Sequence, residues 1–232
     1  METYRRVPTA LLPESRRGAI VTVKGEDGRE YRGRIVRTEG EEAEVRVFEE
    51  IPLGSESPLD IVLVQAIPKK ERMEMIIQKA TELGVKEILP CRSEKSMVQG
   101  EPDSQAQDKS HRWPAIAKRA VEQCRRRVVP RIGPSRCLED VLGELACRQA
   151  TKLVLYEKEQ TMRLKDLLAG PRKEGPATVV IACGPEGGFT RAEIATARSR
   201  GFIPVSLGGR VLRCETAALA AIAILQHVWG DL

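Results

Sequence analysis

Two glycine-rich turns, each directly after a short apolar run, are the stretches of this chain whose residue types and spacing could do chemistry. The first spans residues 184–189 and follows 178–183; the second spans 207–213 and follows 204–206. Ligands of open α/β sheets bind at the carboxyl ends of the strands. Glycine there lets backbone N–H and C=O groups approach a ligand without an intervening side chain. The pattern therefore predicts one ligand site formed by both turns.

A tight turn without a ligand is the simpler interpretation of either glycine run taken alone. The spacing matches neither the G-x-G-x-x-G pattern of dinucleotide sites nor a Walker loop. The second turn, however, runs into Arg213-x-Glu215-Thr216 at the expected start of a helix. The first is followed by Thr190-x-x-Glu193, a capping box that begins a helix, which Gly201 ends. Two such strand–turn–helix units favour a binding site.

Strands and helices that would position these turns alternate along the second part of the chain. Apolar runs predict strands at 61–64, 86–90, 151–156 and 178–183. Helical spacing predicts helices at 68–84, 113–124, 138–146, 190–201 and 215–229. This alternation is typical of an α/β domain with a mostly parallel sheet. The last helix is apolar on nearly every side, so we expect it in the core or in a subunit interface.

The first part of the chain, residues 1–56, predicts a small β domain. Apolar and β-branched runs indicate strands at 19–23, 31–36 and 43–48, with a hairpin turn at 26–28. Proline, glycine and small polar residues at 49–58 indicate a linker. The domain has ten basic and twelve acidic residues. A basic strand face that contacts phosphates and an ordinary solvated surface therefore both remain open.

Positive charge is concentrated in one window rather than spread over the chain. The whole chain has 38 Lys and Arg against 33 Asp and Glu, whereas the window 109–136 has nine basic residues and one acid, Glu122. Cations at a helix C-terminus also stabilise the helix dipole, but nine exceed what that needs. We expect a surface that binds a polyanion. Its candidate residues are Lys118, Arg125, Arg126 and Arg127.

Arg72 is a further candidate for anion binding. It lies with Lys69 and Lys70 at the start of a predicted helix, where the dipole disfavours cations. Three solvated charges would explain the same pattern, so the interpretation stays open at this point.

The composition excludes several classes of function. Aromatic residues make up 3% of the chain, which argues against a stacking platform for single-stranded nucleic acid. The six cysteines form no C-x-x-C pair and there are two histidines, so we expect no metal site. The sequence shows neither a signal peptide nor a run long enough to span a membrane. We expect a reduced, cytoplasmic protein with no membrane partner.

Several motifs together resemble one known family. They are Gly184-Pro-Glu-Gly-Gly-Phe189, Leu207-Gly-x-Arg-Val-Leu-Arg213, Glu215-Thr-Ala217, the K-x-x-R-M…K-A-T-E-L-G-V block of 69–85, and the E-Q-x-x-R of 122–126. This set is similar to the signature of the ribosomal RNA small-subunit methyltransferase E family, within the SPOUT superfamily of knotted methyltransferases. The motif set is long and ordered, so the match is specific.

The resemblance implies a two-domain fold. A SPOUT-type α/β methyltransferase domain with a deep trefoil knot would occupy 59–232, preceded by a small PUA-like, RNA-binding β-barrel at 1–56. Threaded chains are rare, and only the resemblance implies this knot. The family usually has a longer start before the first strand, where this chain has 9–17, so the completeness of the barrel is left open. The resemblance also implies a homodimer, to which we expect the 215–229 helix to contribute.

The implied activity is methylation of ring nitrogen N3 of a uridine in 16S ribosomal RNA, with S-adenosylmethionine as the donor. N3 carries a proton at neutral pH, so the reaction needs a base or a cation that stabilises the anion. Glu186 and Glu215 are the candidate bases, and Arg213 is the candidate cation. Glu215 could instead be an acid of the helix start that pairs with Arg213. The expected donor-binding residues are Gly184, Pro185, Glu186, Gly187, Gly188, Leu207, Gly208, Val211, Leu212, Arg213 and Thr216.

The expected partner is 16S ribosomal RNA or the small ribosomal subunit. Two alternatives remain at this point. One is a methyltransferase of the same fold that acts on transfer RNA or on a ribose 2′-hydroxyl. The other is a non-catalytic RNA-binding factor, against which the intact glycine turns count.

Overall fold

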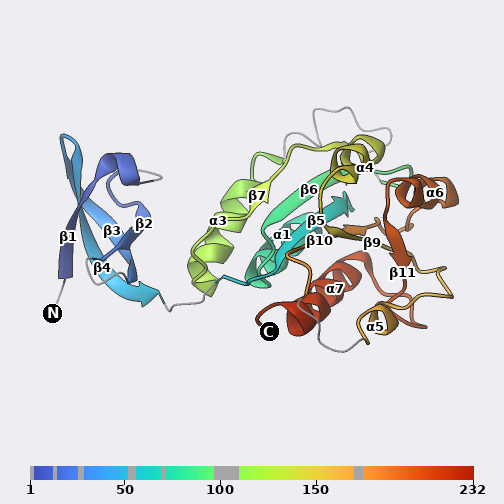
Figure 1. The fold of residues 1–232 in the computed structure, drawn as a ribbon. Helices are drawn as coiled ribbons and strands as arrows, with labels where there is room; N and C mark the ends of the chain where they lie inside the picture. The colour runs from blue at the N-terminus through green and yellow to red at the C-terminus, as the bar shows by residue number, and fades with distance from the viewer. Residues whose placement is uncertain are drawn as a thin grey trace. The chain divides into compact units, whose positions relative to one another are not determined.

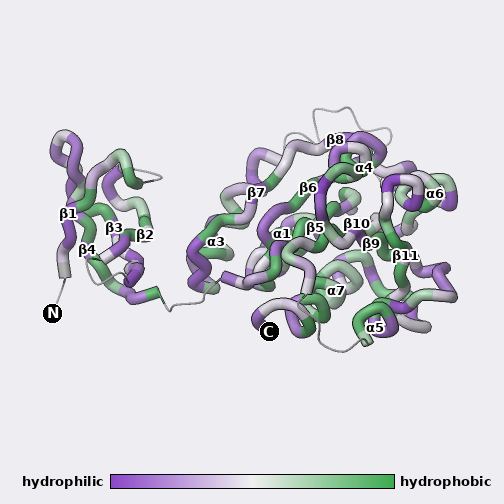
Figure 2. Tube along the Cα trace, in the orientation of Figure 1, coloured by the Kyte–Doolittle hydropathy of each residue, from purple (hydrophilic) through white to green (hydrophobic). Residues whose placement is uncertain are grey.

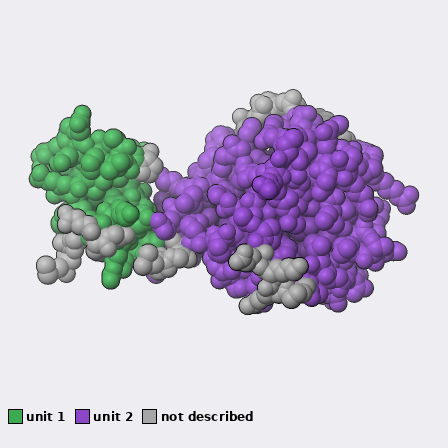
Figure 3. All heavy atoms as spheres, viewed as in Figure 1, with its two compact units in different colours: residues 1–55 green, residues 56–232 purple. Residues whose placement is uncertain are grey.

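The computed structural model describes residues 3–12, 15–25, 29–51, 56–68, 72–96, 110–169 and 175–232. The chain divides into two compact units, Met1–Ser55 and Glu56–Leu232 (Figure 3). The hairpin turn expected at 26–28, and Lys69, Lys70 and Lys109, lie outside the described residues.

Unit 1 is an antiparallel sheet of four strands in the order β1-β4-β3-β2. Its elements are β1 (Thr3–Pro8), a short 3-10 helix (Thr9–Leu11), β2 (Ile20–Lys24), β3 (Glu30–Glu39) and β4 (Glu42–Ile51). Alternate residues are buried, as a half-covered sheet requires; they include Val21, Val23, Ile35, Ala43 and Val45. The three predicted strands are confirmed. β1 was not predicted, because its residues do not alternate; pairing with β4 holds it.

Unit 2 contains a parallel sheet, so the prediction of an α/β domain is confirmed. Its strand order is β11-β9-β10-β5-β6-β7, and β8 also pairs with β6. The strands are β5 (Asp60–Ala66), β6 (Glu87–Arg92), β7 (Arg131–Ile132), β8 (Arg136–Cys137), β9 (Thr151–Leu155), β10 (Thr178–Cys183) and β11 (Ile203–Val205). The carboxyl ends of β9, β10 and β11 consequently lie at one edge of the sheet.

Helices cover both faces of this sheet (Figure 1). The helices on one face are α1 (Arg72–Glu82), α3 (Trp113–Cys124), α5 (Leu164–Leu167) and α7 (Cys214–Trp229), and those on the other are α4 (Leu138–Ala146) and α6 (Arg191–Ser199). Neighbouring residues of one strand enter opposite layers: Leu63 packs with α1 and α7, whereas Val64 packs with α4 and α6. The strands are therefore continuously apolar, as parallel strands covered on both faces are.

Helix α7 is the central element of the first layer. It packs against α1 and β10, and most of it is coloured hydrophobic in Figure 2. The amide of Gln226, fully buried, accepts a hydrogen bond from Ser57 Oγ at 2.7 Å and donates one to the Leu83 carbonyl at 2.9 Å. These bonds join α7 to the start of unit 2 and the end of α1. Burial of α7 in the core is confirmed; its place in a subunit interface stays a prediction.

Candidate active site

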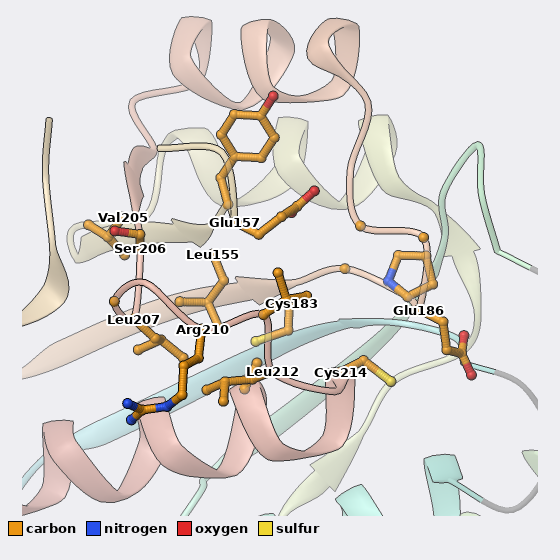
Figure 4. A pocket seen from close by; sticks show the side chains of 18 residues that line it. Leu155, Glu157, Cys183, Glu186, Val205, Ser206, Leu207, Arg210, Leu212 and Cys214 are labelled. Atoms are coloured by element: carbon orange, nitrogen blue, oxygen red, sulfur yellow. The ribbon is translucent and has the colours of Figure 1, made fainter. Parts of the chain in front are cut away.

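An open pocket lies where the carboxyl ends of β9, β10 and β11 meet the start of α7 (Figure 4). It contains about 760 Å³ of space, solvent at its mouth included. Strand-end residues Leu155, Cys183 and Val205 form part of its lining, together with both glycine-rich turns. The two glycine-rich turns, which the sequence predicted to form one ligand site, therefore line the same pocket.

The first turn owes its shape to Gly188 and the helix that follows. Gly188 has φ +62°, and its N–H donates to the Pro185 carbonyl at 2.9 Å, which closes the turn. A Cβ at Gly188 would lie 2.8 Å from the Glu157 carboxylate, so glycine also makes room for that side chain. The capping box is confirmed: Thr190 N–H donates to Glu193 Oε2 at 2.7 Å, and Glu193 N–H donates to Thr190 Oγ1 at 3.2 Å.

The second turn is anchored at both ends and open in the middle. At its start, Ser206 N–H donates to the Met162 carbonyl at 3.0 Å and the Ser206 carbonyl accepts from Leu164 N–H at 2.9 Å. At its end, Arg213 is the N-cap of α7. Between these anchors Val211 is 84% exposed. The turn therefore presents its middle to whatever enters the pocket.

Most of the predicted donor-binding residues lie in the lining of this pocket. They are Gly184, Pro185, Glu186, Gly187, Gly188, Leu207, Gly208, Val211 and Leu212. Arg213 and Thr216 are exposed and lie outside the lining. Residues that sequence reasoning missed are Leu155, Tyr156, Glu157, Cys183, Val205, Ser206, Arg210, Cys214 and Ala217. Strand ends were the available signal for Leu155, Tyr156 and Glu157, since the sequence placed 151–156 in a strand of the same sheet, and Arg210 lies within the predicted turn 207–213.

The turn after β6 braces the first glycine-rich turn. Lys95 Nζ donates to the Gly187 carbonyl at 2.9 Å, and Glu94 N–H donates to Glu193 Oε1 at 2.8 Å. Two buried serines, Ser93 and Ser96, join their hydroxyl groups at 3.0 Å inside this turn. The backbone of the pocket wall is thus fixed from outside the pocket.

Arg72 contacts both candidate bases at the edge of the pocket. Its Nη1 donates to Glu186 Oε1 at 2.7 Å, and its Nε lies 3.9 Å from Glu215 Oε2. Within the described residues the ion pair of Glu215 is therefore with Arg72, and not with Arg213 as one interpretation held. Glu215 does lie in the first turn of α7. Glu215 Oε2 also accepts a hydrogen bond from the Cys214 thiol at 3.2 Å.

The environment fixes the charge of these groups. Burial alone would raise the pKa of Glu215. Hydrogen bonds from its own backbone N–H and from Cys214, with the charges of Arg72 and Arg213, outweigh it and lower that pKa below its ordinary value. Burial, with the neighbouring Glu215 and Glu186, raises the pKa of the Cys214 thiol to about 12. Desolvation would lower the pKa of Arg72, but the charges of Glu215 and Glu186 raise it. At neutral pH Glu215 is therefore a carboxylate, Arg72 a cation and Cys214 a thiol.

Three of the four residues expected to bind a polyanion in the window 109–136 are exposed, and the fourth is buried. Lys118, Arg125 and Arg127 are exposed, and Arg125 is the C-cap of α3 with φ +64°. Arg126 is 5% exposed. Its Nη1 donates to the carbonyls of Thr81 and Val85, both at 2.8 Å, and its Nη2 to Glu56 at 2.8 Å. The prediction that Arg126 contacts RNA is therefore wrong: the residue holds the end of α3 against the end of α1.

The sequence predicted neither a metal site nor a membrane-spanning segment. In the ranges that the structure describes, no group of three or more His, Cys, Asp or Glu side chains is arranged to hold a metal ion. Among those same residues, no helix is both long enough and apolar enough to cross a membrane.

The fold and the pocket define a class of protein. Residues 55–226 match the family of RNA methyltransferase domains. The chain is 36% identical over 188 residues to Ribosomal RNA small subunit methyltransferase E of Buchnera aphidicola subsp. Acyrthosiphon pisum, which covers 81% of this chain and 71% of that protein. The chain belongs to the ribosomal RNA small subunit methyltransferase E family, so the resemblance of its motifs is confirmed.

Two solved structures share the whole fold. One is a Ribosomal RNA small subunit methyltransferase E from Neisseria gonorrhoeae bound to S-adenosyl methionine. It is 33% identical with a TM-score of 0.74, over 100% of this chain and 94% of that one. The other is a methyltransferase from Legionella pneumophila in complex with the bound cofactor SAM. It is 34% identical with a TM-score of 0.74, over the same shares of the two chains.

Proposed function

We propose that this protein transfers a methyl group from S-adenosylmethionine to N3 of a specific uridine in 16S ribosomal RNA. The observation that carries the proposal is the pocket that both glycine-rich turns form at the ends of β9, β10 and β11. The chain is a member of the ribosomal RNA small subunit methyltransferase E family, and two relatives of the same fold were crystallised with this donor.

The residues of the pocket fit the donor. S-adenosylmethionine has an apolar adenine, a ribose with two hydroxyl groups, and a methionine part that carries an ammonium and a carboxylate. Leu155, Leu207 and Leu212 provide apolar surface for the adenine, and the glycine-rich turns provide backbone groups for its ring nitrogens. The carboxylate of Glu157 is an acceptor for hydroxyl or ammonium groups. When bound, the donor supplies an already activated methyl group on a sulfonium, so the protein contributes chiefly alignment.

The acceptor side lies at the edge of the pocket where Arg72, Glu186 and Glu215 meet. Glu186 lines the pocket, whereas Glu215 is held in the first turn of α7; Arg213 occupies the N-cap position of the same helix. These residues are the proposed means of removing the N3 proton or stabilising its loss. We assign RNA backbone contacts to Lys118, Arg125 and Arg127, whose exposed cations suit phosphates.

The finer features of the fold belong to the same proposal. Unit 1, residues 1–55, would be the PUA-like RNA-binding barrel, and residues 56–232 the SPOUT methyltransferase domain with its trefoil knot. The second turn and α7 would form the threaded segment, since they follow β11 at one edge of the sheet and return to pack on β10 near its middle. We propose a cytoplasmic homodimer in which α7, with Ile224 39% exposed, contributes to the interface.

The experiment is methyl transfer from labelled donor to three acceptors: small ribosomal subunits without the modification, naked 16S ribosomal RNA, and transfer RNA. The proposal predicts label in the small subunit or its RNA. Label in transfer RNA alone would move the protein to another branch of the superfamily. Donor binding without any transfer would make it a non-catalytic RNA-binding factor.

A further inference from the structure

Three charged side chains from distant parts of unit 2 converge beside the pocket. Arg72 is the first residue of α1, Glu186 belongs to the turn after β10, and Glu215 lies in the first turn of α7. The exposed fractions of the side chains are 36% for Arg72, 24% for Glu186 and 14% for Glu215. Of the three, Arg72 has the most exposed side chain, whereas Glu186 is the one that lines the pocket.

Neither carboxylate is placed as a proton acceptor for the pocket. Glu186 accepts the 2.7 Å hydrogen bond from Arg72, and Figure 4 shows its carboxylate directed away from the middle of the pocket, to the side of Cys214. Glu215 accepts from the Cys214 thiol and sits at a helix N-terminus, which stabilises its ionised form. A general base works best with a pKa near the working pH, whereas the pKa of Glu215 is lowered.

Other charged groups surround the cluster. Lys95 Nζ bonds to the Gly187 carbonyl, one residue from Glu186, and Arg213 acts on Glu215 from the N-cap of α7. With Arg72, these give three cations against two carboxylates. Two further groups of the lining, Glu157 and Arg210, offset each other, and the Cys214 thiol is neutral. Glu193, whose carboxylate accepts from Glu94 N–H beside Lys95, adds a third carboxylate, so cations and carboxylates balance at this edge of the pocket.

We propose, resting on the methyl transfer proposed above, that Arg72 is a catalytic residue which contacts a carbonyl oxygen of the target uracil and stabilises its N3-deprotonated form. Glu186 and Glu215 are positioning residues that hold the guanidinium. Arginine stays protonated at any working pH and presents several donors in one plane, which suits the carbonyl oxygens that flank N3.

The step balances without a carboxylate base. The N3 proton passes to solvent water. The N3 electron pair then forms the bond to the methyl carbon, and the carbon–sulfur bond breaks with its pair returning to sulfur, which loses its positive charge. Arg72 is unchanged at the end of the step.

The test is single-turnover methylation of small ribosomal subunits at saturating donor and RNA, for the wild-type protein and four variants. Arg72→Gln should lower the rate roughly 100- to 1,000-fold, as loss of one preorganised donor does, with donor affinity within about twofold of wild type. Arg72→Lys should recover part of the rate, because it keeps the charge but loses the planar fork. Glu186→Gln should lower the rate only about tenfold. Lys79→Gln is the matched control; this residue lies on α1 and pairs with Glu82 at 2.9 Å.

The pH dependence separates the roles. If solvent takes the N3 proton, the rate of wild type and of Glu186→Gln rises roughly tenfold per pH unit between about pH 6 and 8. Subunits reconstituted with RNA that contains 5-fluorouridine, whose N3–H is more acidic, should bring Arg72→Gln back toward the wild-type rate. Tryptophan fluorescence first establishes that each variant is folded.

Two results would overturn the role of Arg72. One is a wild-type rate that is independent of pH in that range and collapses in Glu186→Gln, which would make Glu186 the base. The other is an Arg72→Gln protein with the full rate at saturation but weaker, less salt-dependent RNA binding, which would make Arg72 a phosphate contact. A wild-type protein that methylates no uridine N3 would instead overturn the proposed function itself.

Discussion

Replacing Arg126 with Met should destabilise unit 2 and leave RNA binding almost unchanged, although the residue belongs to the most basic window of the sequence. The residue is 5% exposed, and its guanidinium donates to two backbone carbonyls and to Glu56. Met keeps the length of the side chain and removes every donor. The substitution therefore tests whether these contacts, rather than charge alone, give Arg126 its role.

The magnitude follows from the hydrogen bonds that the substitution removes. The carbonyls of Thr81 and Val85 each lose a 2.8 Å hydrogen bond, at a cost of about 1 kcal/mol each; the Thr81 carbonyl keeps a second one, from Gly84 N–H at 3.1 Å. The Glu56 carboxylate loses its cation; its side chain is 26% exposed, so water screens it and the cost is about 1 kcal/mol rather than the full cost of breaking a buried pair. Together these lower the free energy of unfolding by about 3 kcal/mol.

Urea unfolding followed by tryptophan fluorescence measures this directly. The chain has 2 tryptophans, and both Trp113 and Trp229 belong to unit 2, so the signal reports on that unit. A loss of about 3 kcal/mol lowers the urea midpoint by roughly 1–3 M. Arg127→Met is the matched control: the neighbouring side chain is exposed, so its stability should change by less than about 0.5 kcal/mol.

For RNA binding, we expect the larger effect from Arg127→Met and the smaller one from Arg126→Met. Arg127→Met should reduce the slope of log affinity against log salt by about 0.9, as loss of one phosphate contact does, whereas Arg126→Met should leave the slope unchanged. An Arg126→Met protein with an unchanged urea midpoint and a reduced salt slope would refute the assignment of Arg126 to the packing of α3.

Three further predictions concern the pocket, the end of α3 and acid stability. Ala217→Phe places a ring in the pocket that Ala217 lines and should weaken donor binding, measured by calorimetry, at least about 100-fold. Ala192→Phe, on the exposed face of α6, is the control and should leave donor binding unchanged. Equal donor affinities of the two variants would show that the donor does not bind in this pocket. Arg125→Gly relieves the left-handed backbone at φ +64° and should stabilise unit 2 by about 0.5–1 kcal/mol in the same urea assay; a loss of stability would contradict it. Burial raises the pKa of Glu87, but hydrogen bonds from Arg148 at 2.8 Å and Arg131 at 2.8 Å lower it below 4.5 overall. The ionised Glu87 carboxylate therefore stabilises the folded state above pH 4.5, and this contribution is lost as the pH falls through the lower folded-state pKa. The urea midpoint of Glu87→Gln should consequently decrease less than that of the wild type when the pH is lowered below 4.5.

Local patterns in the sequence were sufficient for much of the fold. The capping box at Thr190 and Glu193 fixes the start of α6 through contacts three residues apart, and period 2 or 3.6 marks the long elements. Strands β7 and β8 have two residues each, too few for any period. β1 carries no alternation and is held by β4, about forty residues later in the chain.

In the candidate site, too, the sequence predicted the local features and not the contacts between residues far apart in the chain. The glycine-rich turns are local features, so the sequence identified most of the pocket lining. The contact of Arg72 with Glu186 joins residues 114 apart, and that of Arg126 with Glu56 joins residues 70 apart. Charge in a sequence window says how many cations are present and not which of them the fold buries. For this reason the sequence does not distinguish Arg126, which is buried, from its neighbour Arg127, which is exposed.

The central claim is tested most directly by locating the transferred methyl group on its nucleoside. Small ribosomal subunits that lack the modification are incubated with the protein and labelled donor, and the RNA is digested to nucleosides and analysed by tandem mass spectrometry. The account predicts one methylated uridine in 16S ribosomal RNA with the methyl on ring nitrogen N3, and no product with Ala217→Phe. A methyl group on a ribose hydroxyl, or on no nucleoside of the small subunit, would contradict it.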